Sequence, residues 1–128
     1  MELPLAKLLR RVVIIDHDST YSQFLSRLIA GLGHEVIEIT DPCASDFSEL
    51  KVTDLVFLDV MWPRGEGLQA LKTIVRQCSN CSIALVCEAN ERPKDAEEFA
   101  MQLRQLRLIG VLQKPFRLSD IEKILEEI

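Results

Sequence analysis

The chain lacks internal repeats, low-complexity tracts, linkers and any apolar run near the ~18 residues that a membrane-spanning helix needs. Its first residues contain an early acid and no apolar segment of secretory length. These absences argue against a repeat architecture, a second domain and membrane insertion. What remains is one globular domain of 128 residues, 48% of them hydrophobic, for which we expect a cytoplasmic location.

Basic residues never gather into a run, and the net charge is −5. Binding to nucleic acid or to an anionic membrane through bulk charge is therefore disfavoured. The four cysteines include one pair at metal or redox spacing, Cys78 and Cys81, without a second pair or nearby histidines. We interpret the cysteines as reduced thiols of a cytoplasmic chain.

Short β-branched or apolar runs alternate with segments of helical periodicity after an N-terminal extension at residues 1–10. Strands are expected at 11–15, 35–39, 54–59, 83–86 and 109–113. Helices are expected from Asp18 or Ser19 to about 32, near 44–50, at about 67–77, from 90–93 onward, and after a cap at Ser119 or Asp120. The first helix has an apolar face made of Phe24, Leu25, Leu28, Ile29 and Leu32. This alternation predicts one α/β domain at 11–128, with a parallel sheet covered by helices on both faces.

The apolar run that ends in Asp59 is the most informative stretch of the chain. Its continuous hydrophobicity indicates a strand buried on both faces, which places Asp59 at the carboxyl edge of the sheet, where open α/β folds carry their chemistry. Asp16, His17 and Asp18 follow the first strand in the same way, and Lys114 ends the fifth. Crowded carboxylates repel one another unless a cation such as Lys114 compensates them. Such a cluster is suited to holding Mg²⁺ and accepting a phosphoryl group.

From about Arg11 to its C-terminus the chain resembles the receiver domain of bacterial two-component response regulators. The resemblance rests on these residues, in this order: Asp16, Asp59, Pro63, Gly67 and Lys114-Pro115-Phe116. It implies a flavodoxin-like (βα)5 fold, doubly wound, with the strand order 2-1-3-4-5. It also implies a cis peptide bond between Lys114 and Pro115.

The same resemblance implies a signalling module rather than an enzyme. A histidine kinase or phosphotransfer protein would supply a phosphoryl group to Asp59, and Lys114 would offset the charge of its oxygens. Asp16, Asp59 and the backbone carbonyl of Met61 would hold Mg²⁺. A downstream protein would bind the face made by the fourth helix, the fifth strand and the fifth helix. A homodimer is the other assembly that the resemblance allows.

Three positions depart from the family pattern. His17 replaces the second acid, the direct Mg²⁺ ligand, and imidazole is a poor partner for a hard cation; Asp18, one residue later, is the candidate substitute. Cys87 replaces the Ser or Thr whose hydroxyl bonds the phosphoryl group, and a thiol is a weak donor. Val111 replaces the aromatic residue that changes rotamer. We therefore expect an atypical receiver.

Two alternatives stay open at this point. The first is a receiver-like module that acts through constitutive protein contacts without phosphorylation, because Cys87 and Val111 weaken the switch. The second is an FMN-binding, flavodoxin-like protein, since Ser19-Thr20-Tyr21-Ser22 is rich in hydroxyl groups. Against it, Asp16 and Asp18 would repel the phosphate of FMN, and the turn has no glycine.

Overall fold

The computed structural model of the protein describes residues 10–39, 55–60, 66–77, 82–88, 94–95, 98, 101 and 107–127. Within them, five parallel strands form one sheet in the order β2-β1-β3-β4-β5. The strands are β1 (Arg11–Ile15), β2 (Glu35–Ile39), β3 (Leu55–Asp59), β4 (Ser82–Glu88) and β5 (Arg107–Lys114). The helices are α1 (Ser19–Gly31), α2 (Glu66–Gln77) and α4 (Leu118–Glu126). The predicted doubly wound α/β fold and its strand order are confirmed.

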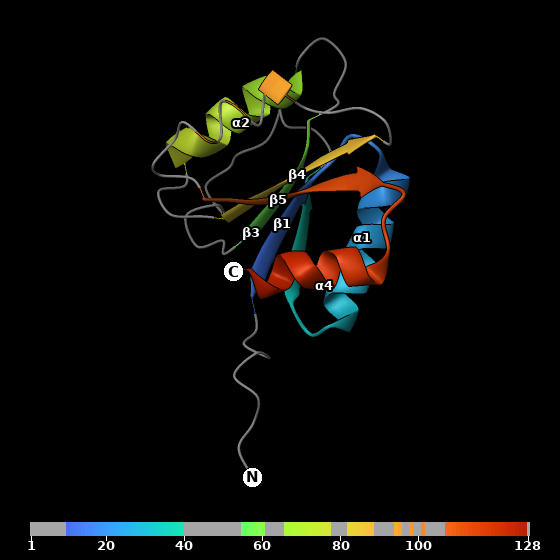
Figure 1. Ribbon diagram of the computed structural model, residues 1–128. Coiled ribbons are helices and arrows are strands. Elements are labelled where there is room, and N and C mark those ends of the chain that lie inside the picture. The colour runs from blue at the N-terminus through green and yellow to red at the C-terminus, as the bar shows by residue number, and fades with distance from the viewer. Residues whose placement is uncertain are drawn as a thin grey trace.

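Helices cover both faces of the sheet (Figure 1). On one face, α2 packs Leu71 and Ile74 against buried residues of β1, β3 and β4. On the other face, α1 contributes Leu25 and Ile29, and α4 contributes Ile121 and Ile124. Because β3 lies between these two layers, all five of its residues are buried, as its unbroken apolar run predicts. No helix among the described residues is long and apolar enough to cross a membrane.

The ends of several elements differ from the sequence prediction. β4 and β5 extend beyond their apolar centres because polar end residues also pair, Ser82 with Arg107 and Glu88 with Lys114. Hydrophobicity alone does not reveal such pairs. The stretches where helices were expected, near 44–50 and from 90–93 onward, lie outside the described residues except for positions 94, 95, 98 and 101, which are helical.

The prediction that Ser119 or Asp120 caps the last helix was wrong. Its N-cap is Arg117, and α4 begins at Leu118. Asp120 lies in the first turn, where its Oδ2 accepts a hydrogen bond from the Arg117 backbone N–H at 2.8 Å. The carboxylate therefore satisfies the backbone from inside the helix rather than from the cap residue.

The apolar face predicted for α1 is only partly buried. Leu25 and Ile29 reach the core, whereas Phe24 and Leu32 are 47% and 40% exposed. The apolar face of α1 is wider than the area of α1 that contacts the sheet, so part of that face is exposed to solvent. There Phe24 packs beside Phe116, with 5.8 Å between the ring centroids.

Phe57 and Phe24 provide a matched test of this packing. Phe57 lies in β3 and is fully buried, so Phe57→Ala should lower the unfolding free energy by about 3–5 kcal/mol. Phe24→Ala, at a half-exposed position, should cost much less. Urea denaturation followed by circular dichroism measures both; equal losses would contradict the burial of β3.

Candidate functional site

Three buried charged side chains meet at the carboxyl edge of the sheet. Asp16 follows β1, Asp59 ends β3 and Lys114 ends β5, with exposed fractions of 3%, 1% and 2%. Because β1 and β3 are neighbours in a parallel sheet, their carboxyl ends place the two carboxylates side by side. Lys114 reaches them across β4, which separates its strand from β3.

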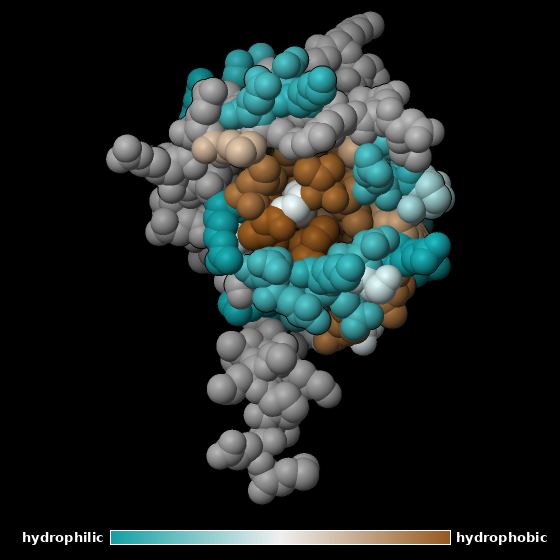
Figure 2. Space-filling model, in the orientation of Figure 1, coloured by the Kyte–Doolittle hydropathy of each residue, from teal (hydrophilic) through white to brown (hydrophobic). Residues whose placement is uncertain are grey.

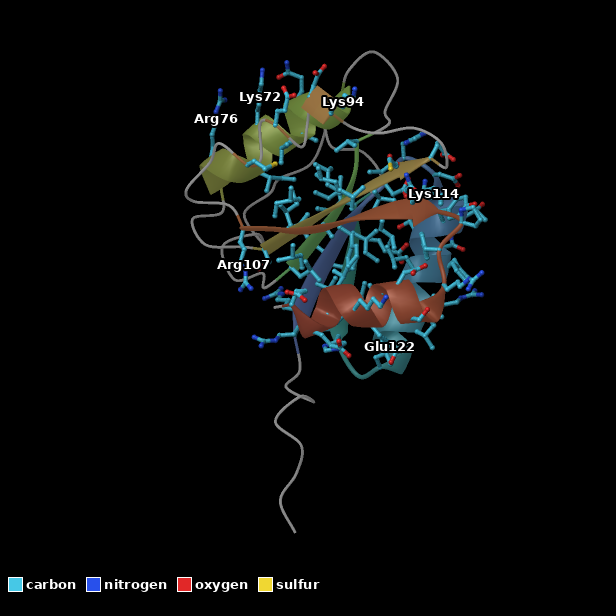
Figure 3. All side chains as sticks on the ribbon, viewed as in Figure 1. Lys72, Arg76, Lys94, Arg107, Lys114 and Glu122 are labelled. Carbon is cyan, nitrogen blue, oxygen red and sulfur yellow. The ribbon has the colours of Figure 1, made fainter. Side chains whose placement is uncertain are left out.

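The Lys114 ammonium contacts both carboxylates. Its Nζ donates a hydrogen bond to Asp59 Oδ2 at 3.0 Å and lies 3.1 Å from Asp16 Oδ2. Figure 3 shows Lys114 at the end of β5 nearest α1, whereas Arg107 lies at the other end of the same strand. The Lys114–Pro115 peptide bond is cis, as the family resemblance implies. The single positive charge of Lys114 therefore connects the carboxyl ends of β1, β3 and β5.

The loop between β1 and α1 is fixed by its own side chains. Asp16 Oδ1 accepts a hydrogen bond from the Asp18 backbone N–H at 2.8 Å. Asp18 is the N-cap of α1, and its Oδ1 accepts from the Thr20 backbone N–H at 3.0 Å. Asp18 therefore caps a helix and lies outside the cluster of candidate metal ligands that the described residues form. The suggestion that Asp18 replaces the missing second acid finds no support in this geometry.

His17 enters the cluster at the position of that second acid. Its Nδ1 lies 3.6 Å from Asp59 Oδ2 and 3.9 Å from Asp16 Oδ1, and its side chain is 38% exposed. One ligand atom from each of Asp16, His17 and Asp59 lies within 4.8 Å of the others. Mg²⁺ demands an octahedral shell of oxygens, so two carboxylates and an imidazole fit this ion poorly.

The other residues singled out in the sequence lie at the margin of the cluster or outside the described residues. Cys87 is fully buried near the end of β4, where it pairs with Gln113 of β5. Val111 is 37% exposed on β5. Met61, Pro63, Cys78 and Cys81 lie outside the described residues.

Tyr21 belongs to the site, although the sequence alone did not assign it to the charged cluster. The Lys114 Nζ lies 4.5 Å from the centroid of the Tyr21 ring, a cation–π distance. The Tyr21 ring in turn packs against Phe116, with 6.0 Å between centroids. The sequence signal was the position of Tyr21 in the first turn of α1, directly after the acidic loop, but this contact requires the fold.

Burial dominates the electrostatics of the cluster. Burial raises the pKa of Asp16 from 3.8 to about 6; the Asp18 amide and Lys114 oppose this, and the charge of Asp59 adds to it. Burial alone would lower the pKa of Lys114. The hydrogen bond and charge of Asp59, together with Asp16, outweigh burial and raise that pKa above its usual value. Lys114 is therefore a cation at neutral pH.

The raised pKa of Asp16 makes stability depend on pH. Between 3.8 and about 6 the folded chain binds more protons at this carboxyl than the unfolded chain, so the unfolding free energy contributed by Asp16 falls as pH rises through this window. Asp16→Asn should remove this slope and stabilise the protein at pH 7 by up to about 3 kcal/mol. Urea denaturation from pH 4 to pH 7 in metal-free buffer checks it. An Asp16→Asn variant no more stable than the parent at pH 7 would overturn the prediction.

Removal of the Lys114 charge should have the opposite effect. Lys114→Met leaves two buried carboxylates without their shared cation, and we expect a loss of about 3–5 kcal/mol at neutral pH. Lys123→Met changes an exposed lysine of α4 and is the matched control. Equal unfolding midpoints for the two variants would show that Lys114 does not compensate the pair.

Comparison with known proteins agrees with this geometry. A family model described as the response regulator receiver domain matches residues 12–126. The positive alginate biosynthesis regulatory protein of Pseudomonas aeruginosa is 30% identical over 125 residues, covering 91% of this chain and 46% of that protein. This chain spans less than half the length of the curated relatives it matches.

Solved structures share the fold. A response regulator from Colwellia psychrerythraea has a TM-score of 0.75 at 24% identity, covering 92% of this chain and 94% of that chain. The Vibrio cholerae chemotaxis protein CheY4 also has a TM-score of 0.75, at 19% identity, with 94% and 99% covered. Because the family model spans nearly the whole chain, this protein belongs to the response regulator receiver domains of two-component signalling.

Proposed function

We propose that Asp59 accepts a phosphoryl group from a histidine kinase or a phosphotransfer protein. The observation that carries this proposal is the 3.0 Å hydrogen bond from Lys114 Nζ to Asp59 Oδ2, between two side chains that are almost fully buried at the carboxyl edge of the sheet. A strongly desolvated carboxylate paired with a fixed cation is more typical of a chemical site than of a stabilising surface pair.

The transfer exchanges one bond to phosphorus for another. An Asp59 carboxylate oxygen attacks phosphorus, and the bond from phosphorus to the donor imidazole nitrogen breaks. The electron pair of that bond stays on the nitrogen, which takes a proton from solvent where the imidazole would otherwise be left anionic. The product is an acyl phosphate on Asp59. Lys114, protonated at neutral pH, lies beside the oxygens on which negative charge resides and offsets it without moving far.

The output surface is proposed to be the edge of the sheet at β5. Figure 2 shows an apolar surface over β5, between the hydrophilic side chains of α2 and α4. β5 is the end strand of the sheet, Val111 is 37% exposed, and Leu108 and Ile109 are partly buried. A downstream protein would contact β5 and α4, the fifth strand and fifth helix of the predicted output face, whose fourth helix was expected from 90–93 onward. A homodimer through β5 is the alternative. Both would form in the cytoplasm.

A second candidate function is a module that binds its partner without phosphorylation. Three observations favour it: an imidazole stands in the metal position, the thiol of Cys87 stands in place of a hydroxyl, and aliphatic Val111 stands in place of the switching ring. An apolar surface lies over β5, where Val111 is 37% exposed, and constitutive binding requires an accessible contact surface of this kind.

Phosphorylation of the purified chain separates the two candidates. We expect acetyl phosphate or phosphoramidate to add one phosphoryl group, detected by intact mass, in the presence of Mg²⁺, Mn²⁺ or Ni²⁺. The adduct should be labile to hydroxylamine because it is an acyl phosphate. Asp59→Asn should abolish it, whereas Asp95→Asn, at an exposed position, should not.

The outcome decides between the candidates. A folded protein that acquires no phosphoryl group with any donor or ion contradicts the phospho-acceptor proposal and supports constitutive binding. An adduct that survives in the Asp59→Asn variant would place the chemistry on another residue.

A further inference from the structure

The candidate metal ligands have a composition that differs from the oxygen set expected in this family. From it we infer that Asp16, His17 and Asp59 form a site for a borderline divalent transition ion such as Ni²⁺, Co²⁺ or Zn²⁺, in place of Mg²⁺. The inference deepens the proposed function, on which its meaning for phosphotransfer rests, by naming the class of ion. Metal binding itself is measured without a phosphoryl donor.

The spacing of the donor atoms suits such an ion. The Nδ1 of His17 is 3.6 Å from Asp59 Oδ2 and 3.9 Å from Asp16 Oδ1. Donors at about 2.1 Å from an ion lie about 3.0 Å apart at the 90° angles typical of Ni²⁺, and about 3.4 Å apart in the tetrahedral shell typical of Zn²⁺. Rotation of the partly exposed imidazole by up to about 1 Å would bring Nδ1 to these separations from the two carboxylates, whose nearest ligand atoms lie within 4.8 Å of each other.

The loop that carries His17 is already positioned. Asp16 accepts a hydrogen bond from the Asp18 backbone N–H, and Asp18 caps α1 through Thr20, so both neighbours of His17 are fixed. The hydrogen bond to Asp16 Oδ1 also orients that carboxylate, as hydrogen bonds to the ligands of a metal ion commonly do. The imidazole is 38% exposed to the solvent from which an ion would arrive, so it can turn toward the two carboxylates.

Charge and donor chemistry together select the ion. The two carboxylates and the one ammonium together carry a net charge of −1, which a divalent cation would offset. A carboxylate oxygen that accepts from Lys114 retains a second lone pair for a metal. An imidazole adds little for Mg²⁺ but binds Ni²⁺, Co²⁺ and Zn²⁺ well, so His17 determines which ions are held.

The test is calorimetric titration of Ni²⁺ and Mg²⁺ into untagged, metal-free protein. Most nitrogen and oxygen sites bind Ni²⁺ more tightly than Mg²⁺, so a higher Ni²⁺ affinity alone says little. The informative result is whether the Ni²⁺ affinity depends on His17. His17→Ala should weaken Ni²⁺ binding at least about tenfold and leave Mg²⁺ binding nearly unchanged. His17→Asp should restore an oxygen set and strengthen Mg²⁺ binding at least about tenfold.

Two controls locate the effect. The chain has only two histidines, and His34 lies at the other end of α1, where its Nδ1 accepts a hydrogen bond from the Arg10 backbone N–H at 3.0 Å. His34→Asn keeps an acceptor there and should leave Ni²⁺ binding unchanged. The double variant Cys78→Ser and Cys81→Ser tests whether thiols bind the ion instead.

Each result bears on the inference. Ni²⁺ affinity that is unchanged by His17→Ala, or that is lost in the His34 or cysteine variants, overturns it. If His17→Ala does not fold, paramagnetic broadening by Ni²⁺ of the amide signals of residues 16–18 and 59 in the parent protein supports the site, and broadening confined elsewhere overturns it. Failure of phosphorylation with intact Ni²⁺ binding would instead contradict the proposed function alone.

Discussion

The ammonium group of Lys114, held between Asp16 and Asp59, is the interaction on which the rest of the site depends. It joins the ends of three strands that the chain reaches at residues 16, 59 and 114, and all three side chains are nearly inaccessible to water. The free-energy cost of removing three charged groups from water can exceed the gain from their mutual attraction. Apolar side chains at these positions would therefore serve stability alone as well or better. Their presence supports the proposal that Asp59 carries out chemistry.

Replacement of an acid by His17 changes the electrostatics of the resting site. A third carboxylate would face the same single lysine and increase the repulsion that already raises the pKa of Asp16. An imidazole in place of a carboxylate removes one negative charge while keeping a donor atom 3.6 Å from Asp59. The resting protein therefore needs a cation less than a site with three acids does, and on the inference drawn above its ions would be selected by nitrogen rather than by oxygen.

The site is also tied to the surface through ring contacts. Tyr21 touches Lys114 through a cation–π contact and packs on Phe116, and Phe24 also packs on Phe116 while remaining 47% exposed. These contacts connect the Lys114 ammonium, ring by ring, to an exposed part of α1. Among the described residues, the ring in contact with the charged cluster is that of Tyr21 of α1, whereas Val111 of β5 is aliphatic.

Sequence by itself determined the layout of this protein. The β-branched run at 11–15, the strand at 35–39 and the continuous apolar run ending in Asp59 could be predicted because burial on one or both faces of a sheet dictates residue type position by position. The polar strand ends and the family motifs then indicated which carboxylates and which lysine share one edge.

Only the tertiary structure decided which of these groups touch. Lys114 and Asp59 are 55 positions apart, and their 3.0 Å contact depends on strand order and on a side chain crossing β4. The cap role of Asp18, the exposure of Phe24 and the ring of Tyr21 over Lys114 likewise follow from how α1 lies against the sheet. Local pattern dictates which residues are apolar and where elements run, whereas hydrogen bonds and charge contacts depend on ångström-scale placement that non-local packing sets.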